Sequence, residues 1–334
     1  MTAHHPSHID QSPTLAGVDF DRTPFVAIWE TTRACDLACK HCRAEAIPDP
    51  LPGQLTTEEG FGVLDELAQM KTPICVLSGG DPAKRSDLVQ LVRYGHELGM
   101  RMATIPAATP LLTRQLLCDL KEAGLAQLAL SLDGPTADLH DGFRTTPGAF
   151  DHTIRGAALA REVGLPLQIN TTLTAASWPY FDRMTELVSS LGVVFWEVFF
   201  LVPMGRGSAL QQLNGEQYER LFERLSRFAG TADFIVKVTE APHYRRYLMQ
   251  RQSAGQPSTN GKPGSGGRER RGPGALPGHM RRDFGPGGSI GLAPKGVNAG
   301  KGHLFISHCG EIFPRIACWI RGTPSESMRP PHPG

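Results

Sequence analysis

The feature that most restricts the fold is an alternation of short apolar runs with amphipathic segments. Six runs of strand length occur in the first 202 residues: 25–32, 74–80, 101–107, 127–134, 167–173 and 193–202. The segments between them place apolar residues three or four positions apart, and they often end at glycine, as helices do. This alternation predicts an α/β fold with a parallel sheet and right-handed crossovers. An incomplete barrel and an open doubly wound sheet both satisfy it.

Composition changes sharply after this region. A further helical segment, 215–230, and a strand-like run from 234 complete the regular pattern. Residues 250–289 then consist largely of Gly, Pro, Ser and Arg, with almost no large apolar side chains. Such a segment cannot bury enough surface to form a core, so we expect a linker. Beyond it, residues 302–314 have the pattern of a β-hairpin that turns at Cys309 and Gly310.

The bulk composition excludes several classes of protein. A net charge of +1 provides no general attraction to nucleic acid or to a membrane. The first twenty residues lack the apolar core of a secretory signal, and the apolar run 193–203 is too short to cross a bilayer. Seven cysteines, three of them crowded together, do not resemble a disulfide framework. We therefore expect a cytoplasmic protein.

The crowded thiols are Cys35, Cys39 and Cys42, which directly follow the first predicted strand. Three thiolates on a [4Fe–4S] cluster leave the fourth iron free to bind a reactive ligand. A structural zinc ion is the alternative, with His41 or a distant residue as the fourth ligand. His41 lies between two residues of the row, so sharing one ion would strain the short loop. Cysteines without any metal are the third possibility.

Further unusual motifs occur near the ends of other predicted strands. "SGGDP" (78–82) follows the second strand, "SLDG" (131–134) ends the fourth, "NTT" (170–172) lies in the fifth, and "PMGRG" (203–207) follows the sixth. The carboxyl ends of parallel strands meet at one edge, where ligands bind in α/β folds. These loops are therefore expected to form a single site with the cysteines.

The spacing C-x3-C-x2-C after an N-terminal strand resembles the signature of the radical S-adenosylmethionine (AdoMet) superfamily. "SGGDP" resembles the glycine-rich strand end that receives the methionine part of AdoMet, although Asp81 stands where Glu is common. "LSLDGPTADLHDGFR", "INTTL" and "FFLVPMGRG" resemble the subgroup that carries a C-terminal SPASM or twitch extension. That subgroup includes enzymes that modify haem precursors and enzymes that modify peptides.

The resemblance implies a partial (β/α)6 TIM-like barrel with a small, irregular C-terminal extension. We expect an N-terminal tail (1–24), the barrel (25–241), the Gly/Pro/Arg-rich linker (242–289) and a degenerate extension (290–334). Val297 stands where such extensions often have a cysteine, and only Cys309 and Cys318 remain beyond it. We therefore expect no auxiliary cluster.

The resemblance also implies cofactors, partners and site residues. The cofactors are a [4Fe–4S] cluster and AdoMet, whose reductive cleavage yields a 5′-deoxyadenosyl radical that abstracts hydrogen from a tetrapyrrole or a peptide. A flavodoxin or ferredoxin is the expected electron donor, and no nucleic acid or membrane is expected. The implied cluster ligands are Cys35, Cys39 and Cys42. The implied cofactor contacts are His41, Ser78, Gly79, Gly80, Asp81, Ser131, Asp133, Arg144 and Asn170. A non-enzymatic binding protein stabilised by zinc or iron–sulfur is the rival.

Overall fold

One large sheet organises the protein. The computed structural model describes residues 23–253, 298–299 and 302–314. Within these residues the sheet has ten strands in the order β10-β9-β1-β2-β3-β4-β5-β6-β7, with β8 paired to β9. The strands are β1 (Val26–Thr32), β2 (Ile74–Gly79), β3 (Arg101–Thr104), β4 (Leu125–Ser131), β5 (Leu167–Leu173), β6 (Phe195–Phe200), β7 (Ile235–Thr239), β8 (Asn298–Ala299), β9 (Gly302–Ile306) and β10 (Ile312–Phe313).

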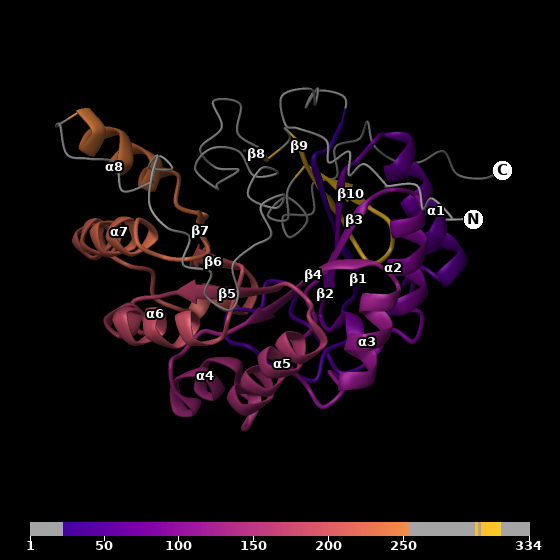
Figure 1. Ribbon diagram of the computed structural model, residues 1–334, viewed down its shortest axis with the longest axis horizontal. Coiled ribbons are helices and arrows are strands. Elements are labelled where there is room, and N and C mark those ends of the chain that lie inside the picture. The colour runs from indigo at the N-terminus through magenta and orange to yellow at the C-terminus, as the bar shows by residue number, and fades with distance from the viewer. Residues whose placement is uncertain (1–22, 254–297, 300–301, 315–334) are drawn as a thin grey trace, which may run out of the picture.

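Helices connect the strands and lie along the outer side of the curved sheet (Figure 1). They are α1 (Thr57–Gln69), α2 (Leu88–Glu97), α3 (Arg114–Glu122), α4 (Ala137–Arg144), α5 (Ala149–Val163), α6 (Phe181–Ser190), α7 (Gly215–Ala229) and α8 (Pro242–Ser253). Short 3₁₀ segments, η2 (Pro82–Lys84), η3 (Trp178–Tyr180) and η4 (Gly205–Ala209), lie in the connecting loops. No helix in the described part of the chain combines the length and hydropathy needed to cross a bilayer.

The strand order decides between the two architectures that the sequence allowed. Strands β1 to β7 are all parallel and follow one another in chain order without a reversal. A doubly wound sheet reverses its strand order to place helices on both faces, whereas sequential right-handed crossovers place every helix on one face. The fold is therefore the predicted partial barrel, with seven parallel strands rather than six. Among the described strands, β7 and β10 form the two unpaired edges.

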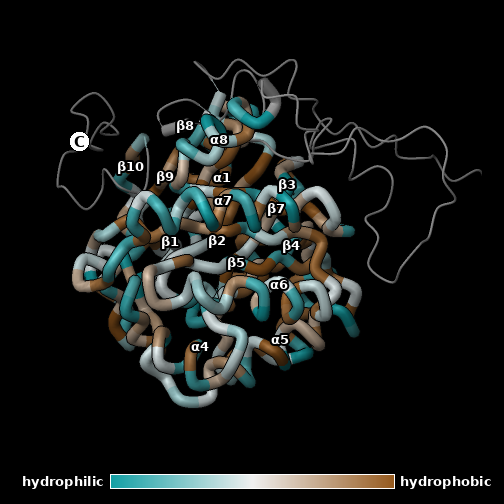
Figure 2. The backbone as a smooth tube through the Cα atoms, turned by 90° about the vertical axis from the view of Figure 1, so that its left-hand side faces the viewer, coloured by the Kyte–Doolittle hydropathy of each residue, from teal (hydrophilic) through white to brown (hydrophobic). Residues whose placement is uncertain are grey.

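Local sequence accounts for the helices and their buried faces. Thr56 and Glu59 form a capping box at the start of α1, and Asn214 and Gln217 form another before α7. One side of each helix packs on the sheet, and Trp29 is among the largest fully buried side chains. Figure 2 shows hydrophobic residues concentrated on the strands and hydrophilic ones on the outward turns of α7. This packing leaves the loops at the strand ends for the site.

Three segments differ from the prediction, and the first is the C-terminal hairpin. It forms as predicted, with β9 antiparallel to β10 and Gly310 at φ +84°. However, β9 pairs in parallel with β1, so the hairpin extends the main sheet. The predicted linker begins too early, because residues from 242 to 253 form α8; residues 254–289 lie outside the described residues. Helix α4 was not predicted, although Asp138 in its first turn is a usual start signal.

The end of β2 packs directly on the chain that leaves β1. Gly79 has φ +141°, and a Cβ there would lie 2.2 Å from the Thr32 carbonyl oxygen. A Cβ on Gly80 would lie 2.4 Å from the Ala34 carbonyl oxygen. These contacts are with backbone, which cannot rotate away. Both glycines are thus required by chain packing, whatever they do for a ligand.

We predict that Gly79→Ala lowers the free energy of unfolding by about 1–3 kcal/mol or more, because it combines an unfavourable φ with a backbone clash. Gly62→Ala is the matched control, since nothing lies within 4 Å of its Cβ position in α1. That control should raise stability by about 0.5–1 kcal/mol. Urea unfolding of both variants tests the difference, and equal stabilities would contradict the packing argument.

Candidate functional site

The three cysteines of the row lie in an irregular loop immediately after β1, and all three are free thiols. Cys35 and Cys39 are buried in a small apolar cluster with Leu37 and Ala46, and Cys42 packs against it. Each sulfur accepts one N–H hydrogen bond. The Leu37 amide donates to Cys35 Sγ, the Ala46 amide to Cys42 Sγ, and the Arg144 guanidinium to Cys39 Sγ, each at 3.4 Å.

Donors directed at sulfur suit thiolates, which are the form that ligates iron or zinc. Burial raises the pKa of Cys35 to about 12, although the Leu37 amide acts in the opposite direction. A buried thiol of this kind ionises only when a cation compensates its charge, so metal binding would release a proton. The donor set therefore fits a metal centre better than it fits idle core cysteines.

The end of α4 supports the cysteine loop from one side. The Lys40 amide donates to the Phe143 carbonyl oxygen at 3.0 Å, and Thr145 Oγ1 donates to the Ala38 carbonyl oxygen at 2.5 Å. The His41 ring stacks on Phe143 with 4.6 Å between ring centroids. Burial, followed by the charge of Arg144, lowers the pKa of His41 to about 4. His41 is therefore neutral at physiological pH, and its buried Nδ1 has no hydrogen-bond partner among the residues that the structure describes.

Arg144 and Asp133 form a buried ion pair beside Cys39. Asp133 Oδ1 also accepts from the Thr172 amide at 2.7 Å. Burial alone would raise the pKa of Asp133, but the Arg144 charge holds it below the usual range. Asp133 thus orients Arg144, and both of its carboxylate oxygens already accept hydrogen bonds. These contacts give no support for a direct role of Asp133 at the cofactor. Within the described part of the chain, Arg144 Nε is buried without a hydrogen-bond partner, so it could donate to a ligand.

Asp81 is fully buried and caps η2. Its carboxylate accepts from the Ala83 amide at 3.0 Å, the Ala107 amide at 3.1 Å and the Thr109 hydroxyl at 3.2 Å. The carboxylate thereby ties the loop after β2 to the loop after β3. These contacts explain Asp81 without a ligand, so its predicted contact with AdoMet stays a prediction.

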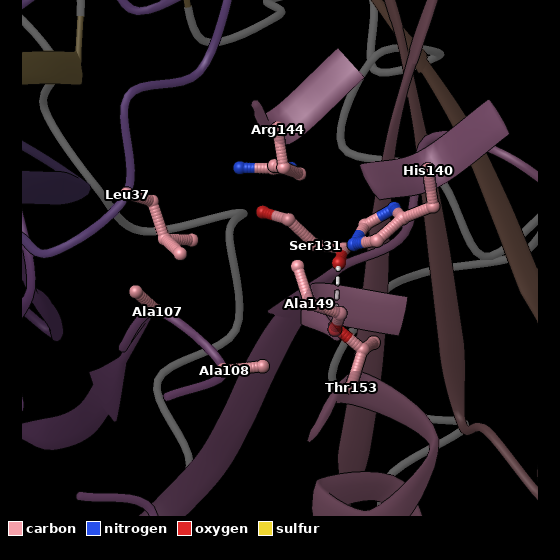
Figure 3. Close-up of a pocket in the computed structure, with 8 residues that line it drawn as sticks. All are labelled: Leu37, Ala107, Ala108, Ser131, His140, Arg144, Ala149 and Thr153. Atoms are coloured by element: carbon pink, nitrogen blue, oxygen red, sulfur yellow. Dashed lines mark hydrogen bonds between the residues drawn. The ribbon is translucent and has the colours of Figure 1, made fainter. Parts of the chain in front are cut away.

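Ser131 lies at the end of β4, where its hydroxyl points into a small pocket between Leu37, His140 and Arg144 (Figure 3). The pocket offers about 20 Å³, which is room for one or two water molecules. His140 Nδ1 accepts from the Asp133 amide at 3.0 Å, so its other ring nitrogen carries the proton. The structure thus brings Ser131 and Arg144 to one place beside the cysteine loop.

Asn170 is the neighbour of Ser131 in the β4–β5 register. Its Oδ1 accepts from Gln168 Nε2 at 2.6 Å, and the same Gln168 nitrogen lies 3.0 Å from Glu197 Oε2. Glu197 in turn pairs with Lys237 at 2.9 Å. A polar row therefore crosses the strands from β5 to β7, and Asn170 keeps only its amide N–H groups to offer a ligand. Ser78, on β2, has its carbonyl oxygen bonded by the Thr31 hydroxyl at 3.0 Å.

Two residues at the site were missed by the sequence reasoning. Arg206, in the "PMGRG" motif, donates from Nε to the Cys39 carbonyl oxygen at 3.0 Å. Glu30 on β1 is fully buried, and its carboxylate oxygens accept no hydrogen bond from the described residues; His308 Nδ1 lies 3.6 Å from Oε2. The position of Arg206 after a strand was a usable signal. Nothing in the sequence marked Glu30, because its surroundings are assembled from distant segments.

We predict that Arg144→Met destabilises the fold by about 3–5 kcal/mol, since it leaves the Asp133 carboxylate buried and unpaired. Arg114→Met is the control, because its partner Glu162 is on the surface and such pairs contribute about 0–1 kcal/mol. The low pKa of Asp133 means that the ion pair persists from neutral pH down to about pH 4. Removing Arg144 leaves burial to raise the pKa of Asp133, so the loss measured by urea unfolding should be larger at pH 7 than at pH 5, where the carboxyl can take up a proton. A loss at pH 7 no larger than that of Arg114→Met would refute the assignment.

A second prediction concerns Asp81, whose pKa is raised to about 6 by burial, against the lowering effect of the Ala83 and Ala107 amides. A raised carboxyl pKa means that the folded state holds the proton more tightly than the unfolded state. Stability from this group is therefore greatest below about pH 4 and falls by up to about 3 kcal/mol as pH rises through 6. Asp81→Asn keeps one acceptor oxygen for the Ala83 and Ala107 amides, places an NH2 group against the Thr109 hydroxyl oxygen, and should remove this dependence. Urea unfolding between pH 4 and 7 measures it; parallel curves for the two proteins would refute it.

Comparison with known proteins agrees with this geometry. Residues 29–176 match the family model described as the radical SAM superfamily. The chain is 39% identical over 289 residues to an AdoMet-dependent heme synthase of Oleidesulfovibrio alaskensis, covering 86% of this chain and 68% of the relative. It is 30% identical over 211 residues to the mycofactocin maturase MftC of Mycobacterium tuberculosis, covering 62% of this chain and 51% of the relative.

Solved structures share the fold at low sequence identity. Streptococcus suis SuiB, bound to its precursor peptide SuiA, superposes with a TM-score of 0.65 at 15% identity, covering 90% of this chain. The chain spans 62% of the length of that structure. A likeness at this identity concerns architecture alone, whereas the heme synthase is similar in sequence over most of both chains. The chain belongs to the radical S-adenosylmethionine superfamily, whose cofactors are a [4Fe–4S] cluster and AdoMet.

Proposed function

We propose that Cys35, Cys39 and Cys42 hold a [4Fe–4S] cluster and that the chain uses it to abstract hydrogen from a tetrapyrrole of the haem pathway. The observation that carries this proposal is the donor pattern of the loop, in which every sulfur of the row accepts one N–H. When bound, the cluster supplies the electron that cleaves AdoMet into methionine and the 5′-deoxyadenosyl radical that takes the hydrogen atom.

The residues around the loop support binding of both cofactors. Three buried polar atoms have no hydrogen-bond partner in the described residues: His41 Nδ1, Arg144 Nε and Arg206 Nη2. Buried polar groups are normally satisfied, so a polar ligand or ordered water belongs among them. Arg144, whose charge is held in place by Asp133, suits the AdoMet carboxylate. The Asn170 amide N–H groups suit an acceptor on the nucleoside.

The zinc alternative fits the loop less well. In the described part of the chain, no three His, Cys, Asp or Glu side chains are grouped closely enough to hold a single metal ion. Zinc requires all of its ligands at about 2.0–2.3 Å from one point. A cluster takes each thiolate on a separate iron, and so accepts sulfurs that lie farther apart.

A tetrapyrrole is favoured over a peptide by the extent of the sequence likeness. The heme synthase aligns over 86% of this chain, whereas the mycofactocin maturase aligns over 62% at lower identity. A peptide remains the second candidate substrate because of that maturase. A flavodoxin or ferredoxin remains the proposed electron donor, and the low potential of the cluster is the reason that a strong reductant is needed.

We predict that the anaerobically reconstituted protein holds about four iron atoms per chain and absorbs broadly near 400 nm, as thiolate-bound iron does. With dithionite and AdoMet it should form 5′-deoxyadenosine, measured by mass spectrometry. Cys39→Ala should abolish both cluster and product. Cys118→Ala is the matched control, since this thiol lies on α3 and contacts Arg114.

The substrate is tested with a deuterated iron porphyrin that bears carboxylate side chains and, separately, with peptides. Transfer of deuterium into 5′-deoxyadenosine from the porphyrin supports the proposal. Transfer from a peptide alone would favour the second candidate. A colourless, zinc-loaded protein, or product formation by Cys39→Ala, would defeat the whole proposal. About eight irons per chain would contradict the expected absence of an auxiliary cluster.

A further inference from the structure

We infer that Arg206 is a positioning residue that clamps the segment carrying Cys39 and Cys42, and thereby sets the spacing of their sulfurs. The inference rests on the proposed function, because it takes the cysteine row to be the cluster site. Arg206 lies in η4, after β6, and is more than 160 residues from the loop in sequence. The two segments meet only because the fold brings the ends of β1 and β6 to the same edge.

Three hydrogen bonds join Arg206 to the loop. Its Nε donates to the Cys39 carbonyl oxygen at 3.0 Å, and its Nη1 donates to the Ala46 carbonyl oxygen at 3.3 Å. Its backbone amide donates to the Cys42 carbonyl oxygen at 3.2 Å. The contacts thus fall at Cys39, at Cys42 and four residues beyond. A planar guanidinium with a fixed fork of donors holds two such acceptors in one geometry, which Lys cannot do.

Gly205, which precedes Arg206, shows how closely the segment after β6 packs on the cysteine loop. Gly205 has φ +51°, and a Cβ there would lie 2.7 Å from the Arg43 carbonyl oxygen and 2.8 Å from that of Cys42. Main chain therefore packs on main chain directly after the third cysteine. Only glycine fits this position, and the close packing at Gly205 places the next residue, Arg206, beside the loop.

The loop needs such support because it has little regular structure of its own. Between β1 and α1 the described chain forms one isolated bridge, Ala34 to Ile47, and the Cys42 amide bonds the Cys39 carbonyl oxygen at 3.1 Å. The end of α4 holds the loop at Ala38 and Lys40, before the third cysteine. Arg206 holds it at and after that cysteine. Groups that orient metal ligands in this way commonly change metal affinity 10–100-fold when removed.

The test compares Arg206→Ala, Arg206→Lys and the control Arg224→Ala in the reconstituted full chain. Arg224 is also partly buried, but in the described part of the chain it contacts Asp182 and Trp178 and not the cysteine loop. Transfer of iron to an Fe(II) chelator is followed under anaerobic conditions. We expect Arg206→Ala to release iron at least tenfold faster than the wild type, Arg206→Lys to release it at an intermediate rate, and Arg224→Ala to match the wild type.

Two further readouts separate positioning from a general loss of stability. The electron paramagnetic resonance spectrum of the reduced cluster should change in Arg206→Ala and not in Arg224→Ala. In the apoprotein, iodoacetamide should alkylate Cys39 and Cys42 faster in Arg206→Ala, with the fully buried Cys75 unchanged as the internal reference. Faster alkylation of Cys75 as well would indicate global loosening and would overturn the inference.

Iron release, spectrum and alkylation that equal those of Arg224→Ala would also overturn it. The proposed function fails separately, if the wild-type chain retains no cluster at all. In that case the alkylation experiment still decides whether Arg206 clamps the thiol loop, because it needs no metal.

Discussion

Two main-chain hydrogen bonds at the carboxyl ends of β1 and β2 determine where the cysteine loop begins. The Gly80 amide donates to the Thr32 carbonyl oxygen, and the Asp81 amide donates to the Ala34 carbonyl oxygen, both at 2.7 Å. They form only because Gly79 and Gly80 carry no Cβ where the neighbouring backbone passes. The first cysteine follows at once, so the location of the whole thiol row depends on this backbone contact between β2 and the chain leaving β1.

Beyond this starting point, the loop is held by groups from two other parts of the fold. The end of α4 supplies Phe143, Arg144 and Thr145, and the segment after β6 supplies Arg206. Arg144 donates to the sulfur of Cys39, whereas Arg206 donates to the carbonyl oxygens of Cys39 and Ala46. The partner of Arg144 is Asp133, whose burial is tolerable only while the ion pair is intact. We regard this ion pair as orienting Arg144 toward Cys39, since intact buried ion pairs contribute little net stability.

The inner side of the sheet carries charged side chains. Glu197 of β6 and Lys237 of β7 form an ion pair. His303 of β9 lies near both charges. Burial lowers its pKa, Lys237 lowers it further and Glu197 raises it. These strands are far apart in the sheet order, so the curvature of the barrel brings them together. The same curvature keeps the apolar core on the outer side, between the sheet and the helices.

The sequence by itself determined the class of the fold, the thiol row and the glycine-rich edge, because these depend on periodicity and on short-range spacing. It also predicted the hairpin at Gly310 correctly, since a turn is a local event. It did not reveal that β9 pairs with β1, that Asp133 pairs with Arg144, that Arg206 reaches the cysteine loop, or that Glu30 is fully buried beside His308. Each of these was decided only by the tertiary structure, because sheet closure brings together residues that no spacing in the chain relates.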